Sequence, residues 1–371
     1  MIQTRDYRTD KYKTYIPKTL ARKFCVATDI MIGRYGPPIF QIFRGLEGAY
    51  NVALVKAIPH EEIIHKDYLF YFISQYEIWA FVENLSQRSG GQTGVDLDKL
   101  KKYPFPLPPL PEQQKIASIL STVDEKLENI DAQISKTQEL KKGLMQQLLT
   151  KGIGHTKFKS SELGDIPDSW EVVVLSNYAV SFAGGTPLRS KKEYYENGTI
   201  PWVKSGEVNQ MNILKTREHI TEEAINDSSA KLIKVNSVLV ALYGATAGNV
   251  GMLRIEAASN QAVLAISAKT DDIVNNFIYH YLKLVTRKLM SLTQGSGQPN
   301  LSKGIIDSLK IPLPKKSEQQ KIATILSTVD EKITSLQTKK QTYQQLKKGL
   351  MQQLLTGRIR VQTSQTEPSL A

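Results

Sequence analysis

The residue types that most often carry catalysis are few in this sequence and lie far apart. The chain has one cysteine, Cys25, and five histidines that lack the paired spacing of a metal site. The glycine-rich stretch Gly295-Ser296-Gly297 has no lysine where a phosphate-binding loop requires one. No cluster of carboxylates with a lysine suggests a nuclease. The sequence therefore predicts no catalytic site and no bound metal or cofactor.

The chemistry that the sequence does offer is that of cations and side-chain amides. Among 371 residues, Lys and Arg number 48 against 36 for Asp and Glu, a formal charge of +12 and a pI of about 9.4. This basic excess favours a polyanionic partner. Hydrophobic residues make up 41%, enough for ordinary cores, and the length predicts two or more domains.

The ends and apolar runs of the chain bear on its compartment. The first residues, MIQTRDYRTDKYK, are polar and charged, unlike a signal peptide. No run of 18 apolar residues predicts a membrane span. A single cysteine suits a reducing compartment. We expect a cytoplasmic protein.

A near-identical repeat is the strongest signal in the sequence. EQQKIASILSTVDEK begins at Glu112 and EQQKIATILSTVDEK at Glu318, an offset of 206 residues. LKKGLMQQLLT begins at Leu140 and, at the same offset, at Leu346. Residues 112–150 match their second copy at 26 of 39 positions, although 127–137 do not match at all. The two ends of the repeat are therefore retained while its middle diverges.

Each copy is predicted to be one long helix with a coiled-coil seam. Apolar residues alternate at spacings of four and three. The seam residues are Ile116, Leu120, Val123, Leu127, Ile130 and Ile134, then Ile322, Leu326, Val329, Ile333 and Leu336. Pro111 suits the first helical position of one helix, Ser317 with Gln320 predicts a capping box for the other, and Gly152 and Gly357 would end them. About 40 residues give a helix of about 60 Å, and the two are expected to pack on each other.

A coiled-coil seam requires only apolar character, so the retained polar residues indicate a second use. We interpret them as a partner-binding surface present twice; a homo-oligomeric coiled coil or a recent duplication are the alternatives. The candidates are Gln113, Gln114, Lys115, Asp124, Glu125, Lys141, Lys142, Gln146, Gln147, Gln319, Gln320, Lys321, Asp330, Glu331, Lys347, Lys348, Gln352 and Gln353.

Two dissimilar globular segments alternate with the helices. The second has β-type runs at Trp170, Val238 and Ala262 and a helical stretch from Ile273. The first follows the later part of this plan, with strands at 24–36 and near Tyr50 and a helical stretch at 66–85. The predicted domains are 1–108, helix 109–152, 153–314, helix 315–357 and a polar tail at 358–371.

The first globular segment is shorter than the second before its matching strand. About 70 residues precede VLVALYG in the second domain, against about 25 before IMIGRYG in the first. No counterpart of GDIPDSW, GGTP or IPWVKSGE precedes Phe24. We therefore expect the front part of the first domain to be missing.

The order of these motifs resembles the specificity subunit of type I restriction–modification systems. The residues that carry the resemblance are GDIPDSW at 164–170, GGTP at Gly184, IPW at Ile200, the proline-rich exits before each EQQKIA, and the duplicated LKKGLMQQLLT. It covers nearly the whole chain, because the order occurs twice.

The resemblance implies an α+β protein with two target-recognition domains joined by two long conserved helices in an antiparallel coiled coil. It implies that each domain reads one half of a split double-stranded DNA site, with half-sites about one turn apart. The helices would dock two methyltransferase subunits, and restriction/translocase subunits would join. S-adenosylmethionine, ATP and magnesium would be used by those partners and not by this chain.

Residues in loops and at strand ends could read such DNA. Arginine suits guanine, asparagine and glutamine suit adenine, and cations suit phosphates. The candidates are Arg34, Tyr35, Arg44, Asn51, Arg88 and Gln92 in the first domain, and Arg189, Lys191, Lys192, Lys204, Ser205, Tyr243, Asn260, Gln261, Gln298 and Asn300 in the second. Trp170 and Trp202 are expected in the core.

Three other functions can be weighed against the sequence, and the first of them is disfavoured. An adenine methyltransferase would need an acidic or amide residue, two prolines and an aromatic ring, but Gly36-Pro37-Pro38 lacks both flanks. A coiled-coil adaptor would bind no DNA. A shortened specificity subunit would have one working domain, or a first domain completed by a separately encoded fragment.

Overall fold

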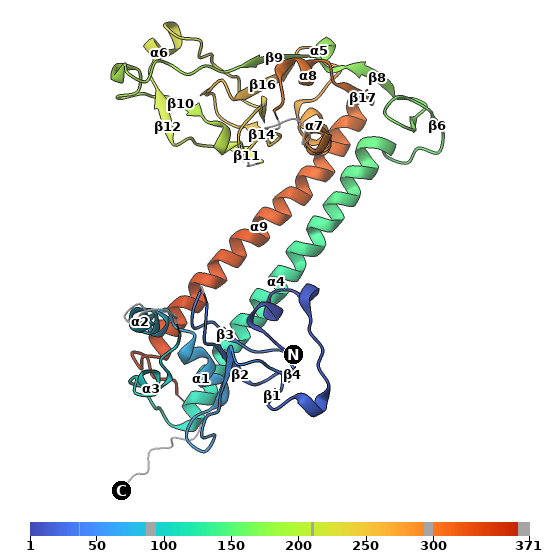
Figure 1. Ribbon diagram of the computed structural model, residues 1–371. Helices are drawn as coiled ribbons and strands as arrows, with labels where there is room; N and C mark the ends of the chain where they lie inside the picture. The colour runs from blue at the N-terminus through green and yellow to red at the C-terminus, as the bar shows by residue number, and fades with distance from the viewer. Residues whose placement is uncertain (37, 87–93, 209–210, 293–299, 363–371) are drawn as a thin grey trace. The chain divides into compact units, whose positions relative to one another are not determined.

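The chain forms two compact units, each with a globular part and one end of each long helix (Figure 1). The computed structural model describes residues 1–36, 38–86, 94–208, 211–292 and 300–362. The first unit contains Met1–Ala132 and Thr338–Ala371, and the second contains Gln133–Gln337. No helix within the described ranges is both long and apolar enough to span a bilayer.

The first unit is built on a small antiparallel sheet with the strand order β3-β2-β5. Ile32 of the central strand pairs with Ile42 on one side and with Val55 on the other. Its elements are η1 (Thr4–Tyr7), η2 (Asp10–Tyr12), η3 (Lys18–Leu20), β1 (Phe24–Cys25), β2 (Ile30–Gly33), β3 (Ile42–Phe43), β4 (Gly48–Ala49), β5 (Leu54–Ala57), α1 (Lys66–Ile73), α2 (Tyr76–Ser86) and α3 (Leu97–Leu100).

One helix was predicted at 66–85, whereas the structure has two. The hydroxyl of Ser74 donates to the carbonyl of Phe70 and ends α1, and the buried Gln75 amide donates to the carbonyl of Phe72. These side chains bind carbonyls at the end of the first helix, which is a local alternative to continuing it. Tyr68 and Tyr71 of α1 are fully buried against the sheet and α4.

The second unit contains a larger sheet with the order β11-β14-β13-β16-β9. Its elements are β6 (Phe158–Lys159), β7 (Ile166–Pro167), β8 (Glu171–Val174), α5 (Leu175–Tyr178), β9 (Ala179–Ala183), η4 (Lys192–Tyr194), β10 (Ile200–Val203), η5 (Ser205–Glu207), β11 (Asn212–Ile213), β12 (Glu218–Ile220), α6 (Glu222–Asn226), β13 (Val238–Ala241), β14 (Val250–Leu253), β15 (Ala258–Ser259), β16 (Val263–Ala268), α7 (Asn275–Leu292), α8 (Lys303–Asp307) and β17 (Lys310–Leu313).

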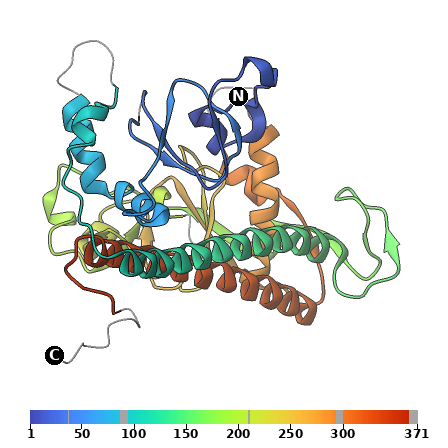
Figure 2. The same ribbon diagram turned by 90° about the horizontal axis from the view of Figure 1, so that it is seen from below.

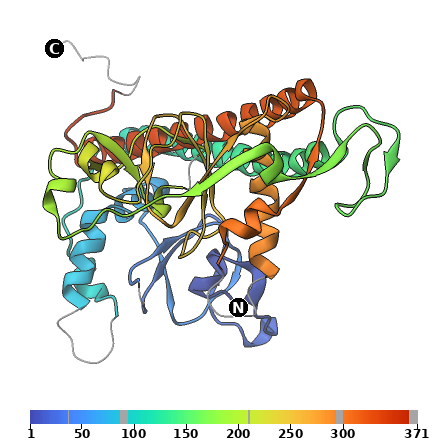
Figure 3. The same ribbon diagram turned by 90° about the horizontal axis from the view of Figure 1, so that it is seen from above.

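The core of the second unit lies between this sheet and α7, which packs along β13 and β14 (Figure 3). A second sheet, β12-β10-β15, lies beside a small cluster around Trp202, and β8 pairs with β17. Trp170 and Trp202 are both buried, as the sequence predicts. The runs that form β13 and β16 are continuously apolar because both strands are buried on both faces.

The two units repeat one sheet plan in the same register. Val240 pairs with Val250 and Leu264 in the second unit, as Ile32 pairs with Ile42 and Val55 in the first. The predicted match of the two globular segments in pattern is therefore a match in strand pairing.

The two predicted long helices are α4 (Leu110–Lys151) and α9 (Lys316–Leu354). Their seam residues are buried or partly buried, as expected. Gly152 and Gly357 have φ of 67° and 72°, the left-handed conformation that ends helices. The predicted capping role of Ser317 is wrong, because α9 begins one residue earlier and Ser317 lies inside its first turn.

An ion pair joins the two helices at equivalent places in each unit. In the first unit Lys347 Nζ lies 2.5 Å from Asp124 Oδ1. In the second, Lys141 pairs with Asp330, which is the same pair displaced by 206 residues. Each unit thus packs the first half of one helix against the last half of the other, in antiparallel fashion (Figure 2).

A buried glutamine attaches each globular part to its own long helix. Gln113 Oε1 accepts from the amide of His65, and its Nε2 donates to the carbonyls of Ile63 and Pro108 at 2.8–2.9 Å. Gln319 makes the same three bonds, to Val274, Asp272 and Pro314. We call this set of three bonds the glutamine clamp. In each unit it connects two segments to the first turn of the long helix: the start of α1 or α7, and the residues just before the long helix.

A glutamate one residue earlier binds the segment that follows the other helix. Glu112 accepts two hydrogen bonds from the Arg360 guanidinium and one from the amide of Val361. The Arg360 bonds, despite opposing desolvation, hold the pKa of Glu112 below its usual value. Glu318 accepts from the indole of Trp170 and the amide of Ile153. The first residues of the polar tail predicted at 358–371 therefore contact the start of α4.

These contacts correct part of the predicted partner surface. Six of the candidates bind within the chain and do not form an exposed surface: Gln113, Gln319, Asp124, Asp330, Lys141 and Lys347. Their identity in both repeats follows from the internal symmetry. The remaining candidates, apart from the partly buried Gln353, are exposed.

Replacement of Gln319 by alanine is expected to lower the free energy of unfolding of the second unit by about 2–4 kcal/mol, because it leaves two carbonyls and an amide buried without partners. The neighbouring Gln320→Ala, at an exposed position, is the matched control and should change stability by less than about 0.5 kcal/mol. Urea unfolding with hydrogen exchange at the start of α7 measures both. Equal midpoints for the two variants would contradict the clamp.

Candidate DNA interface

Loops that follow four strands of the second unit meet at one place. The amide of Gly185, after β9, donates to the carbonyl of Ser259 at 2.9 Å. The amide of Asn260, after β15, donates at 3.0 Å to the carbonyl of Val203, the last residue of β10. The amide of Leu242, after β13, donates to the carbonyl of Ala262 at 2.8 Å. Side chains on these loops therefore share one rim of the unit.

A cation on this rim with several side-chain contacts is Arg189. Its guanidinium lies 4.3 Å from the ring centre of Tyr195 and 5.0 Å from that of Trp202. One nitrogen donates to Glu218 Oε2 at 2.7 Å, and Lys204 pairs with the other oxygen. Stacking on aromatic faces and pairing with a carboxylate restrict an arginine side chain. Arg189 is thus presented to solvent in a fixed position.

The single carboxylate of Glu218 pairs with two cations, Arg189 and Lys204. Partial burial raises the pKa of Glu218, but hydrogen bonds from Lys204 and Arg189 outweigh this and leave it below its usual value. The carboxylate therefore stays ionised at neutral pH. Arg189, Lys204 and Glu218 together therefore carry one net positive charge.

The two glycines of the GGTP turn fit their place because they lack side chains. A Cβ at Gly184 would lie 2.2 Å from the carbonyl oxygen of Ser259, and one at Gly185 would lie 2.3 Å from Ser229. The indole of Trp202 donates to the carbonyl of Gly185 at 3.1 Å. The turn thus brings the loop that carries Arg189 against the core.

The other predicted residues of the second unit occupy the same rim or its flank. Gln261 is exposed and accepts from the Thr186 hydroxyl, and Tyr243 is 38% exposed. Lys191 donates to the Tyr194 hydroxyl at 2.8 Å. The remaining described candidates are exposed or partly buried: Lys192, Ser205, Asn260 and Asn300. Gln298 and the Gly295-Ser296-Gly297 loop lie outside the described residues.

The first unit has a rim of the same design. The amide of Arg34 donates to the carbonyl of Ala53 at 2.8 Å, as that of Leu242 does to Ala262. The amide of Val95 donates to the carbonyl of Arg34 at 3.0 Å, as that of Leu301 does to Leu242. Tyr35 therefore corresponds to Tyr243 and Asn51 to Asn260.

One candidate of the first unit lies away from this rim. The Arg44 guanidinium lies 3.9 Å from the ring centre of Phe70 and pairs with Asp67 at 3.0 Å, so it packs on α1. Its prediction as a DNA contact is not supported by this position. Arg88 and Gln92 lie outside the described residues.

Glu218 and Tyr195 were missed from the sequence. Glu218 lies 29 positions from the arginine that it orients, and strand pairing between β10 and β12 brings it close. Nothing in the local spacing signals this contact. A strand-pairing prediction for β12 could have suggested it.

Comparison with known proteins agrees with the motifs. A family model described as the type I restriction modification DNA specificity domain matches residues 6–139 and 167–347. The Type I restriction enzyme MjaVIII specificity subunit of Methanocaldococcus jannaschii is 32% identical over 367 residues, which cover 94% of this chain and 85% of that protein. The putative MjaX specificity subunit of the same organism is 31% identical over 316 residues, which cover 84% and 72%.

A solved structure shares the fold. The type I restriction–modification S subunit from M. genitalium aligns with a TM-score of 0.60 at 15% identity over 90% of this chain and 84% of that one. The predicted α+β class with long helices is confirmed. The sequence resemblance is confirmed as well, and the chain belongs to the family of type I restriction–modification DNA specificity subunits.

Proposed function

We propose that the chain recognises a bipartite DNA site, each unit reading one half, and directs methylation or restriction by partner subunits. The observation that carries this proposal is the repeated rim. The same pattern of backbone hydrogen bonds occurs in both units, but the side chains at equivalent positions differ in part. A family named for DNA specificity supports it over a coiled-coil adaptor. The chain itself performs no catalytic step, in keeping with a specificity subunit.

The differences between the rims support two unlike half-sites. Tyr35 and Asn51 have the same residue types at the equivalent positions of the second unit, Tyr243 and Asn260. Gln261 stands where the first unit has Val52. Shared residues suit contacts common to any duplex, whereas differing ones suit base edges.

The exposed part of the helix repeat supports two copies of one partner. Six polar identities remain exposed or partly so in both copies: Gln114 with Gln320, Lys115 with Lys321, Glu125 with Glu331, Lys142 with Lys348, Gln146 with Gln352, and Gln147 with Gln353. We assign this face to two methyltransferase subunits. Restriction/translocase subunits would then join, and S-adenosylmethionine, ATP and magnesium would be used by those partners.

Arg189→Ala is expected to weaken binding to the specific site by about 1–3 kcal/mol and to relax its sequence preference in one half. Lys192→Ala, a nearby exposed cation, is the matched control. It should weaken binding to all sequences alike and lower the salt slope by about one. Titrations of DNA at several salt concentrations separate the two. Equal loss on specific and random DNA for Arg189→Ala would remove its assigned role.

Sequencing of methylated bases tests the bipartite site in a host that expresses the chain with its methyltransferase partner. The expected motif is split, with adenine methylated in two unlike halves and a fixed gap, because two rims are presented by one molecule. An unsplit motif, or a palindrome of a single half-site, would contradict reading by the first unit.

A further inference from the structure

The first unit corresponds to the second only from the end of β10 onward. The amide of Asn51 donates to the carbonyl of Ile2 at 3.1 Å, as the amide of Asn260 does to that of Val203. The amide of Gln3 donates to Asp6 and that of Lys204 to Glu207, so η1 and η5 also match. Ile2 is thus the structural equivalent of Val203.

In the second unit, the segment before this point covers three surfaces. Strand β8 pairs with the exit strand β17, and β9 pairs with β16 along the edge of the large sheet. Tyr194, with Ile200 beside it, fills a cluster around Trp202 and Ala258. Residues 171–200, a run of 30, contain all of these elements.

The equivalents of the first two surfaces are uncovered in the first unit. Within the described residues, β5 is an edge strand, whereas its counterpart β16 has neighbours on both sides. Ile58, at the end of β5, is 77% exposed, and Leu107 of the exit segment is 53% exposed. Their equivalents by register are Ser267 and Leu313, which are partly buried under β9 and β8.

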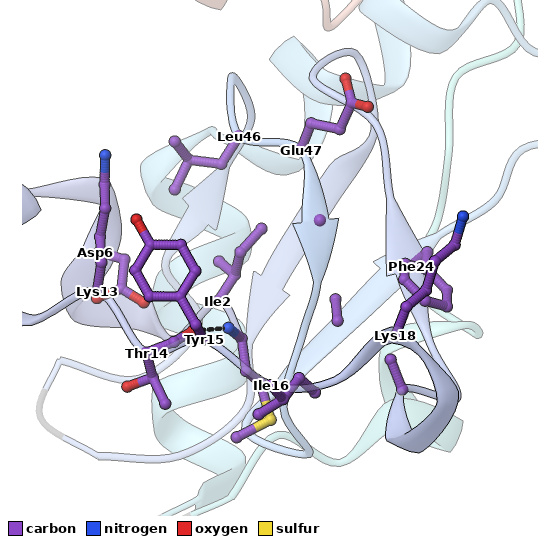
Figure 4. A pocket seen from close by; sticks show the side chains of 14 residues that line it. Ile2, Asp6, Lys13, Thr14, Tyr15, Ile16, Lys18, Phe24, Leu46 and Glu47 are labelled. Atoms are coloured by element: carbon purple, nitrogen blue, oxygen red, sulfur yellow. Dashed lines mark hydrogen bonds between the residues drawn. The ribbon is translucent and has the colours of Figure 1, made fainter.

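The equivalent of the third surface is a pocket. A cavity of about 410 Å³ is lined by Ile2, Ile16, Phe24, Leu46 and Ala49 among others (Figure 4). Ala49 stands at the position of Ala258, in the cluster that Tyr194 and Trp202 fill in the second unit. Tyr15, at its rim, is 87% exposed. Asp6, Lys13, Lys18 and Glu47 also line the cavity, and its apolar lining residues can contact an aromatic side chain.

We propose that these three surfaces form one docking site for an extended polypeptide segment with the pattern of residues 171–200. One strand would pair antiparallel with β5, another with residues 104–107, and an aromatic side chain would enter the pocket. Backbone hydrogen bonds at a sheet edge supply affinity that depends little on the sequence of the added strand. Pockets for its side chains supply specificity. The second unit displays this arrangement in the same molecule.

Register defines the contact on β5. The carbonyl of Ala53 accepts from the amide of Arg34 next to β2, so the backbone groups of Val55 and Ala57 also face β2. Those of Lys56 and Ile58 therefore face the open side. Their counterparts Ala265 and Ser267 lie opposite Phe182 and Val180 of β9. The docked segment begins at the equivalent of residue 171, because Glu112, counterpart of the Trp170 acceptor Glu318, is already occupied by Arg360.

The test uses the full chain and a labelled peptide with the sequence of residues 171–200, and it requires no DNA. Fluorescence anisotropy measures binding, and hydrogen exchange locates it. We expect protection at the amides of Lys56, Ile58, Phe105 and Leu107. Ile58→Pro removes an outward-facing amide and should weaken binding by about tenfold or more. Ile58→Ala, the matched control, keeps that amide and should bind within about twofold of the unaltered chain.

Four outcomes would overturn the proposal. One is equal binding by Ile58→Pro and Ile58→Ala. Another is faster exchange at β8 and β9 without protection of β5, which would mean that the peptide displaces the second unit's own segment. The third is absence of protection at β5 even when the peptide is tethered to Met1, where its local concentration is in the millimolar range. Protection of β5 in the chain alone, rising with protein concentration, would assign the site to a second copy and equally refute it.

Discussion

The glutamine clamps fix each globular part to the helix pair, and the rest of the molecule depends on them. Gln113 and Gln319 are fully buried and use both ends of their amides on backbone groups. A buried amide is favourable only when its donors and acceptors are all used, which makes this geometry specific. The rim of each unit inherits its orientation from that attachment.

The ion pairs between α4 and α9 are a second case of buried polar groups that require specific partners, here between the two long helices. Lys141 and Asp330 have side chains only 12% and 10% exposed, so neither charge tolerates loss of its partner. The equivalent Asp124–Lys347 pair is somewhat more open. The pairs favour an antiparallel register, because each joins the first half of one helix to the second half of the other. A buried charge pair is often more useful for specifying an arrangement than for stability.

Helix positions, the seam, the strand runs and the buried tryptophans could be predicted from the sequence, because periodicity and apolar runs act locally. The structural role of the repeated polar residues could not be predicted from the sequence. Asp124 and Lys347 lie 223 positions apart, and only helix packing shows that they bind each other. Arg189 was recognised as a candidate, but Glu218 was not, since strand pairing brings it close. That the front part of the first domain is missing remains a prediction. The unpaired edge of β5 is the place where the counterpart of β9 would lie.

A double-mutant cycle on Asp330 and Lys141, with a parallel cycle on Asp124 and Lys347, tests the internal pairing most directly. Alanine replacements, singly and together, are compared by chemical unfolding of the full chain. Internal pairing predicts a favourable coupling energy of about 0.5–3 kcal/mol in both cycles and none for the mismatched combination of Asp330 with Lys347. Coupling of zero in both matched cycles would show that these residues do not hold the helices together, and would return them to a partner surface.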